Sequence, residues 1–141
     1  MIPIKRKLKT MAHVLIVDDE LMIRFLVRSV LESAGHQVSE ARDGQAALDL
    51  IEFYPDFYQA IILDLLMPRL SGLEFLATLA NLTAYPPIII LTAHRAWIQK
   101  TLAYKVSGYL TKPFRTRDLI DTVNTQINIR AAASLFYPHT K

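Results

Sequence analysis

The chain contains no cysteine among its 141 residues. Disulfide bonds and thiolate metal sites are therefore excluded, and this composition is typical of proteins that work in the cytoplasm. No apolar run approaches the ~20 residues that a membrane-spanning helix needs. The N-terminus, MIPIKRKLKTMA, is basic but is not followed by the apolar core of a signal peptide, so the sequence predicts no such signal.

Acidic residues are also missing from the first nine positions, which hold four of the 16 basic residues: Lys5, Arg6, Lys7 and Lys9. Residues 10–141 carry the other 12 basic residues against 13 acidic ones, so the overall charge of +3 belongs to an N-terminal arm. Such an arm could contact nucleic acid or another acidic surface, although no helix with clustered Arg or Lys supports nucleic-acid binding. We expect residues 1–12 to be a disordered leader, a segment upstream of a true start at Met11, or a remnant of cloning.

Strand-like and helix-like segments alternate five times after this arm. Short runs of apolar residues, typical of strands that are buried on both faces, predict strands over 14–17, 37–41, 61–63, 88–91 and 108–111. Apolar residues at helical spacing and helix-favouring composition predict helices over 21–34, 43–51, 72–82, 95–105 and 116–130. Gly35 is suited to end the first helix and Asp43 to cap the second. This order predicts one α/β domain with a five-stranded parallel sheet and helices on both of its faces.

Polar side chains stand where the predicted strands end, and in a parallel sheet these ends meet at one edge. The first strand leads to Asp18 and Asp19, the third to Asp64, the fourth to Thr92 and the fifth to Lys112. Carboxylates gathered at one edge repel each other and need a counter-ion, and a set of oxygen ligands suits Mg²⁺. Lys112 and Thr92 would offer a charge and a hydrogen-bond donor to phosphoryl oxygens. Transfer of a phosphoryl group to a carboxylate depends mainly on such positioning and charge neutralisation.

Each of these residues also has a simple structural explanation. An acidic turn often precedes a helix, a lone Thr at a strand end carries little information, and Lys-Pro alone indicates a turn. Their occurrence at separate strand ends, in the order that one site requires, favours the site over chance.

The chain resembles the receiver domains of two-component response regulators, in particular the single-domain chemotaxis type. The resemblance rests on VLIVDDE at 14–20, DLLMP at 64–68 with Gly72, LTA at 91–93 and GYLTKPF at 108–114. It covers residues 13–130 and implies a flavodoxin-like, doubly wound (βα)5 fold with five helices and strand order 2-1-3-4-5. Residues 131–141 would be a short tail without an output domain, so the chain would be a stand-alone receiver or a fragment of a longer regulator.

The resemblance implies a role for each acidic residue of the site. Asp64 would accept a phosphoryl group from a sensor histidine kinase or a histidine phosphotransfer protein. Asp19 and Asp64 would bind Mg²⁺ directly, Asp18 would bind it through water, and the backbone carbonyl of Leu66 would complete the protein ligands.

The resemblance also implies a switch. Lys112 would pair with the phosphoryl oxygens, and the Thr92 hydroxyl would move onto one of them. Tyr109 would turn inward as Thr92 shifts, and the bond between Lys112 and Pro113 would be cis. The phosphorylated form would then favour a different output surface for an unknown downstream protein.

Besides the missing output domain, two features depart from the usual receiver pattern. Leu66 is apolar where receivers often have a polar residue near the path of attacking water, so we expect slower self-dephosphorylation. The segment from Thr92 to Lys112 is about two residues shorter than usual and lacks a Gly-Ala pair, so its geometry is hard to predict. Trp97 and Tyr104 would share one stripe of its helix, as part of the core or as a site for dimerisation.

The leading interpretation is a phosphoacceptor that has no enzymatic activity beyond its own phosphorylation and dephosphorylation. Two other functions are alternatives to it. A Mg²⁺-dependent phosphohydrolase could use Asp64 as nucleophile, but it would need a second carboxylate where Leu66 stands. A constitutive protein-interaction module with a little-used site would not need the intact set Asp18, Asp19, Asp64, Thr92 and Lys112.

Overall fold

Five parallel strands form one sheet in the order β2-β1-β3-β4-β5. The computed structural model describes residues 11–82 and 84–136. The three central strands are apolar and almost entirely buried because helices cover both of their faces. The strands are β1 (His13–Val17), β2 (Gln37–Ala41), β3 (Ala60–Leu63), β4 (Ile88–Thr92) and β5 (Gly108–Thr111). The predicted parallel sheet and its strand order are confirmed.

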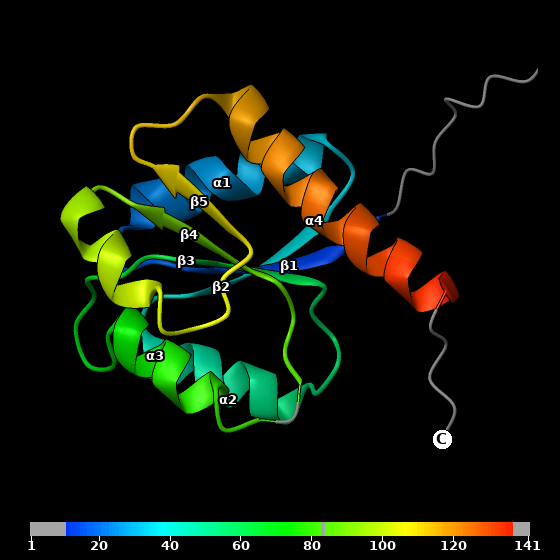
Figure 1. The fold of residues 1–141 in the computed structure, drawn as a ribbon. Coiled ribbons are helices and arrows are strands. Elements are labelled where there is room, and N and C mark those ends of the chain that lie inside the picture. Colours follow the sequence, from blue (N-terminus) through cyan, green and yellow to red (C-terminus); the bar gives the residue numbers. More distant parts are fainter. Residues whose placement is uncertain (1–10, 83, 137–141) are drawn as a thin grey trace, which may run out of the picture.

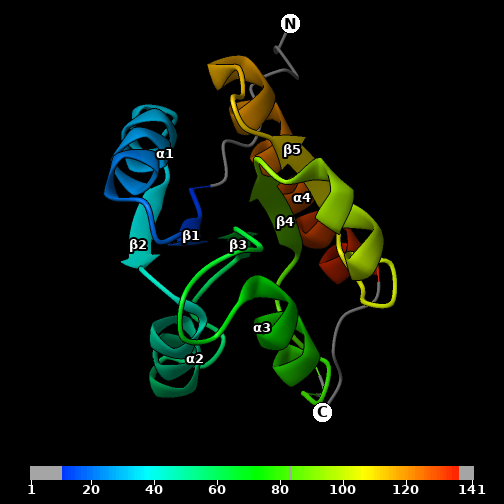
Figure 2. The ribbon, with the colours of Figure 1, turned by 90° about the vertical axis from the view of Figure 1, so that its left-hand side faces the viewer.

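Helices cover both faces of the sheet, as Figure 1 and the turned view in Figure 2 show. They are α1 (Leu21–Ser33), α2 (Gly44–Phe53), α3 (Gly72–Leu79), the 3-10 helix η1 (Arg95–Thr101) and α4 (Thr116–Phe136). Successive strand residues point to opposite faces, so two apolar cores form. Val14 and Ile16 pack with residues of α1 and α4, while Leu15 and Val17 pack with residues of α2 and α3. Within the described ranges, no helix combines the length and apolar character that a membrane crossing requires.

Local signals set several helix ends. Gly35 follows α1 with a φ of 97°, a conformation that a glycine adopts without strain. One carboxylate oxygen of Asp43 accepts a hydrogen bond from the Ala46 amide at 2.8 Å and caps α2. Ser71 and Glu74 form a reciprocal capping box at the start of α3. The stop at Gly35 and the cap at Asp43 are confirmed.

Three helices differ in length from the prediction. The expected helix over 95–105 is the short 3-10 helix η1, which ends at Thr101, because the following residues must return the chain to β5. The Thr101 hydroxyl donates to the Ile98 carbonyl at 2.7 Å, a bond inside this tight helix. Helix α3 ends at Leu79 rather than at residue 82, whereas α4 continues beyond residue 130 to Phe136 through an alanine-rich stretch that favours helix.

Trp97 and Tyr104 are both partly buried. They pack against the core that α2 and α3 form with the sheet, so the explanation of these two rings as part of the core is confirmed. Residues 1–10 of the predicted disordered arm, 1–12, lie outside the described part of the chain. Ala12 does not fit this prediction, because it is buried and its amide donates to Nδ1 of His36 at 3.1 Å.

Candidate functional site

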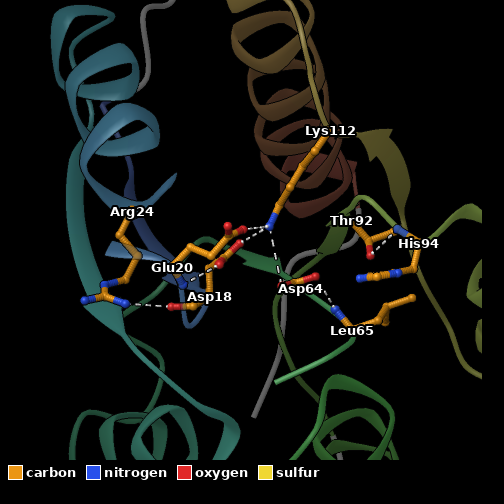
Figure 3. Close-up of polar contacts among 8 residues, drawn as sticks. All are labelled: Asp18, Glu20, Arg24, Asp64, Leu65, Thr92, His94 and Lys112. Carbon is orange, nitrogen blue, oxygen red and sulfur yellow. Dashed lines mark hydrogen bonds and ion pairs between the residues drawn. The ribbon is translucent and has the colours of Figure 1, made fainter. Parts of the chain in front are cut away.

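Asp64 directly follows β3 and is only 5% exposed. Its Oδ1 accepts a hydrogen bond from the Leu65 amide at 2.8 Å, and its Oδ2 lies 3.4 Å from Nζ of Lys112 (Figure 3). Burial raises the pKa of Asp64, and the opposing effects of Lys112 and the Leu65 amide do not cancel this rise. The carboxylate is therefore held in one orientation, with one oxygen anchored and the other directed toward the lysine.

Asp18 directly follows β1 and is fully buried. Its Oδ1 accepts a hydrogen bond from the Glu20 amide at 2.8 Å. Its Oδ2 forms an ion pair with Lys112 at 2.8 Å but has no partner in hydrogen-bond geometry among the described residues. Burial raises the pKa of Asp18 to about 6 against the lowering effect of Lys112.

Lys112 connects the acidic residues. Its Nζ lies 2.8 Å from Asp18, 2.9 Å from Glu20 and 3.4 Å from Asp64. Burial alone would lower the pKa of Lys112, but these carboxylates outweigh burial and raise it, so the side chain stays charged. The bond between Lys112 and Pro113 is cis, as predicted.

Thr92 and Tyr109 lie on the neighbouring strands β4 and β5. Thr92 is fully buried, and its hydroxyl oxygen accepts a hydrogen bond from the His94 amide at 3.1 Å. Tyr109 is 38% exposed, and its hydroxyl lies 2.9 Å from Oγ1 of Thr101. Because Thr101 already donates its hydroxyl proton to a carbonyl, Tyr109 is the donor in this contact. In this structure the Tyr109 side chain therefore points outward and is partly exposed.

The acidic residues offer a set of oxygens that fits a divalent cation. One carboxylate oxygen each of Asp18, Asp19 and Asp64 lie within 4.8 Å of one another. The buried Oδ2 of Asp18 has its ion pair with Lys112 but no partner in hydrogen-bond geometry among the described residues, and it is the kind of atom that a bound cation would satisfy. These hard ligands suit Mg²⁺. Leu66 is half-buried in the loop after Asp64, and the role of its carbonyl stays a prediction.

The sequence did not indicate two residues of the site. Glu20 shares Lys112 with Asp18, although it stands 92 positions away from the lysine. Arg24 donates from its guanidinium to the backbone carbonyl of Asp18 at 2.8 Å (Figure 3). It also pairs with Glu40 at 2.9 Å, and together these contacts fix the end of β1. The acidic run Asp18-Asp19-Glu20 was visible in the sequence, but nothing in it indicated that Glu20 contacts Lys112, and no local signal indicated Arg24.

Gly72 leaves room for the loop that carries Asp64. Its amide donates to the Leu65 carbonyl at 2.9 Å. A Cβ atom at Gly72 would lie 2.3 Å from the Asp64 carbonyl oxygen and 2.7 Å from Cα of Leu65, closer than real Cβ atoms approach. Glycine is therefore the residue that fits this position.

Comparison with known proteins identifies the family. The sequence profile of the family described as "Response regulator receiver domain" matches residues 14–124. The transcriptional regulatory protein CpxR of Escherichia coli is 35% identical over 112 residues, which are 78% of this chain and 47% of that protein. The response regulator MprA of Mycolicibacterium vanbaalenii is 37% identical over 110 residues, 77% of this chain and 47% of that protein. The chain therefore spans about half the length of these curated relatives.

Solved structures give the same result. The receiver domain of a Francisella response regulator superposes with a TM-score of 0.76 at 32% identity, over 84% of this chain and 98% of that one. The family profile covers most of the sequence, and the chain has a five-stranded parallel sheet in the order β2-β1-β3-β4-β5. The chain belongs to the response regulator receiver domain family.

Proposed function

We propose that Asp64 is the phosphoacceptor through which this receiver takes a phosphoryl group in a two-component phosphorelay. One observation carries the proposal: the buried Asp64 faces Lys112 and stands with Asp18 and Asp19 in one cluster of carboxylates. A structural ion pair would need one acid for one lysine. Here an excess of buried negative charge surrounds a single cation, which favours a site built to receive a metal and a phosphoryl group.

The transfer can be written from these residues. A carboxylate oxygen of Asp64 attacks the phosphorus of a phosphohistidine on the donor, and the phosphorus–nitrogen bond breaks with its electron pair left on the imidazole. The Leu65 amide holds the other carboxylate oxygen in place at 2.8 Å. Mg²⁺, held by Asp18, Asp19 and Asp64, would neutralise charge on the phosphoryl oxygens.

Lys112 and Thr92 then stabilise the product. Nζ of Lys112 already lies within 3.4 Å of the carboxylates of Asp18, Glu20 and Asp64. The ammonium therefore needs only a short movement from Asp18 to reach a phosphoryl oxygen on Asp64. The Thr92 hydroxyl oxygen accepts from the His94 amide, so its own proton can be donated toward Asp64 and, after transfer, to a phosphoryl oxygen. These contacts exist only in the phosphorylated state, so they can shift the population of Tyr109 positions.

An exposed apolar surface on α1 suits the phosphodonor. Leu21, Met22, Phe25 and Leu26 are 65%, 71%, 61% and 44% exposed, and they follow the acidic residues directly. Surfaces of this kind mark protein contacts. We assign this surface to the histidine kinase or phosphotransfer protein, whose phosphohistidine must reach Asp64 beside it.

The two alternatives fit the geometry less well. A phosphohydrolase would need an acid two residues after Asp64, where the half-buried Leu66 stands. A constitutive interaction module would gain nothing from keeping a buried, like-charged cluster that costs stability.

Incubation with acetyl phosphate and Mg²⁺, followed by intact-protein mass spectrometry, tests the proposal. We expect an increase of about 80 Da, the mass of one phosphoryl group, in the wild type and none in Asp64→Asn. The Asp49→Asn variant, which removes an exposed acid on α2, is the matched control and should still gain the group. An unmodified wild type or a modified Asp64→Asn would overturn the assignment.

A further inference from the structure

An exposed aromatic patch lies at the edge of the sheet opposite to Asp64, where the strands begin. Phe53, Tyr54 and Phe57 are 75%, 46% and 41% exposed. The ring centroid of Tyr54 lies 5.0 Å from that of Phe53 and 5.6 Å from that of Phe57. The ring of His13, the first residue of β1, lies 4.1 Å from that of Phe57. Exposed aromatic rings that gather in this way mark a binding surface. We call these three exposed rings the aromatic patch.

A groove continues the aromatic patch between α2 and the segment before β4. It has a volume of about 490 Å³, and its apolar lining includes Leu48, Ile51, Tyr54, Tyr58, Leu82 and Tyr85. A groove of this size can hold one or two apolar side chains. The patch and the groove therefore form one continuous apolar surface that shares Tyr54.

The charge around this surface is mostly negative. Glu52 and Asp56 line the groove, and Asp49 lies one turn before on α2. None of the three forms an ion pair with another described residue, although Asp49 accepts a hydrogen bond from Gln45. Arg130 is the basic residue among those that line the groove, and burial lowers the pKa of His13, which favours its neutral form. The surface therefore fits a basic segment that carries apolar side chains.

The chain contains one segment of that chemistry. Residues 1–10, MIPIKRKLKT, lie outside the described residues and hold four basic residues, no acidic residue, and Ile2, Ile4 and Leu8 as apolar groups. The segment joins β1 at His13 through only two residues, and His13 contacts the aromatic patch. Ten residues reach up to about 33 Å when extended. A tether of this kind raises the effective concentration of a segment to the millimolar range.

We propose that the basic arm of residues 1–10 docks on the aromatic patch and groove of its own chain. Its apolar side chains enter the groove and cover the exposed rings, while its lysines and arginine face Glu52, Asp56 and Asp49. A docked arm needs no secondary structure of its own, so its composition does not oppose binding. This surface is separate from the phosphoacceptor edge, and the proposal goes beyond the phosphorelay function.

A spin label on the arm tests this docking in the full chain. Because the protein has no cysteine, a Pro3→Cys variant carries a single nitroxide label at a defined position. We expect the label to broaden the amide NMR signals of residues 52–58, and added salt to weaken the broadening. Phe53→Ser, at an exposed position, and the pair Glu52→Lys and Asp56→Lys should each reduce the broadening to less than about half.

The pair Asp118→Lys and Asp121→Lys is the matched control. These acids lie at the start of α4, beyond β5, and their reversal changes the net charge by the same amount. The control should leave the broadening unchanged. The proposal fails if the labelled wild type shows no broadening of residues 52–58, or if the control reduces it as much as the Glu52 and Asp56 pair does. It also fails if a label on one chain broadens the signals of an unlabelled second chain, which would mean that the arm binds a neighbouring copy.

Discussion

Nζ of Lys112 lies closer to Oδ2 of Asp18, at 2.8 Å, than to Oδ2 of Asp64, at 3.4 Å. The lysine therefore lies nearer to the buried Asp18 than to Asp64, the proposed acceptor. A phosphoryl group on Asp64 would become the greatest negative charge at the site. The short distance between the two positions would let the lysine follow that change without a large movement.

Replacement of Lys112 by methionine leaves the carboxylates of Asp18, Glu20 and Asp64 without their shared cation. We expect the variant to lose about 3 kcal/mol of unfolding free energy, the cost of breaking a buried ion pair by removing one partner. Urea unfolding measures this loss. Lys112→Arg keeps the charge and should lose less, and equal stabilities of wild type and methionine variant would contradict the account.

The contact between Tyr109 and Thr101 is expected to hold the tyrosine in its outward position. A double-mutant cycle with Thr101→Val and Tyr109→Phe isolates this hydrogen bond, because both changes keep the shape of the side chain. The coupling energy should be about 1 kcal/mol. Thermal unfolding of the four proteins gives the value, and a coupling near zero would show that the 2.9 Å contact does not hold Tyr109.

The pH dependence of stability should depend on Glu40, which joins β2 to α1 by ion pairs with Arg28 at 2.6 Å and Arg24 at 2.9 Å. Burial alone would raise the pKa of Glu40, but the hydrogen bonds from these arginines outweigh it and hold the pKa below its ordinary value of 4.5. Because the folded pKa is the lower one, this stabilisation is present above pH 4.5 and is lost as the pH falls through the folded pKa.

Glu40→Gln should therefore lower the unfolding free energy by about 1 kcal/mol at neutral pH, and by progressively less as the pH falls below 4.5 and through the folded pKa. Urea unfolding over a series of pH values checks this. Glu32→Gln, which removes only the exposed partner of Arg28, is the control and should have a smaller effect. A deficit of Glu40→Gln that persisted at low pH would exclude ionisation as its cause.

Leu66 should lengthen the life of the phosphorylated protein, because an apolar side chain two residues after Asp64 cannot orient an attacking water. Leu66→Asn is expected to shorten the half-life of the phosphoryl group several-fold, and Leu66→Met should not. The decay of the phosphorylated form after removal of the phosphodonor measures both. An unchanged half-life in Leu66→Asn would exclude this role.

The site could be predicted from the sequence because parallel strands bring their carboxyl ends to one edge. The apolar runs of β1, β3 and β4 defined the sheet, so the positions of Asp18, Asp64 and Thr92 followed from it. The contacts of Glu20 and Arg24 could not be predicted, since they depend on side chains that meet only after folding. The ion pair of Glu20 with Lys112 joins residues 92 positions apart.

The segment between β4 and β5 shows the opposite case. Its composition predicted a helix over 95–105, but its length and its return to β5 produce the short 3-10 helix η1. Tertiary geometry outweighed local helix preference there. The position of Tyr109 on Thr101 depends on this helix, so it could not be predicted either.

The central claim is that phosphorylation occurs on Asp64, and chemical trapping tests it at the level of the residue. Borohydride reduces an aspartyl phosphate to homoserine, which tandem mass spectrometry of proteolytic peptides locates in the chain. After treatment with acetyl phosphate and Mg²⁺, the account predicts homoserine at residue 64 and unmodified Asp18 and Asp19. Homoserine at residue 18 or 19, or at no residue of the cluster, would contradict it.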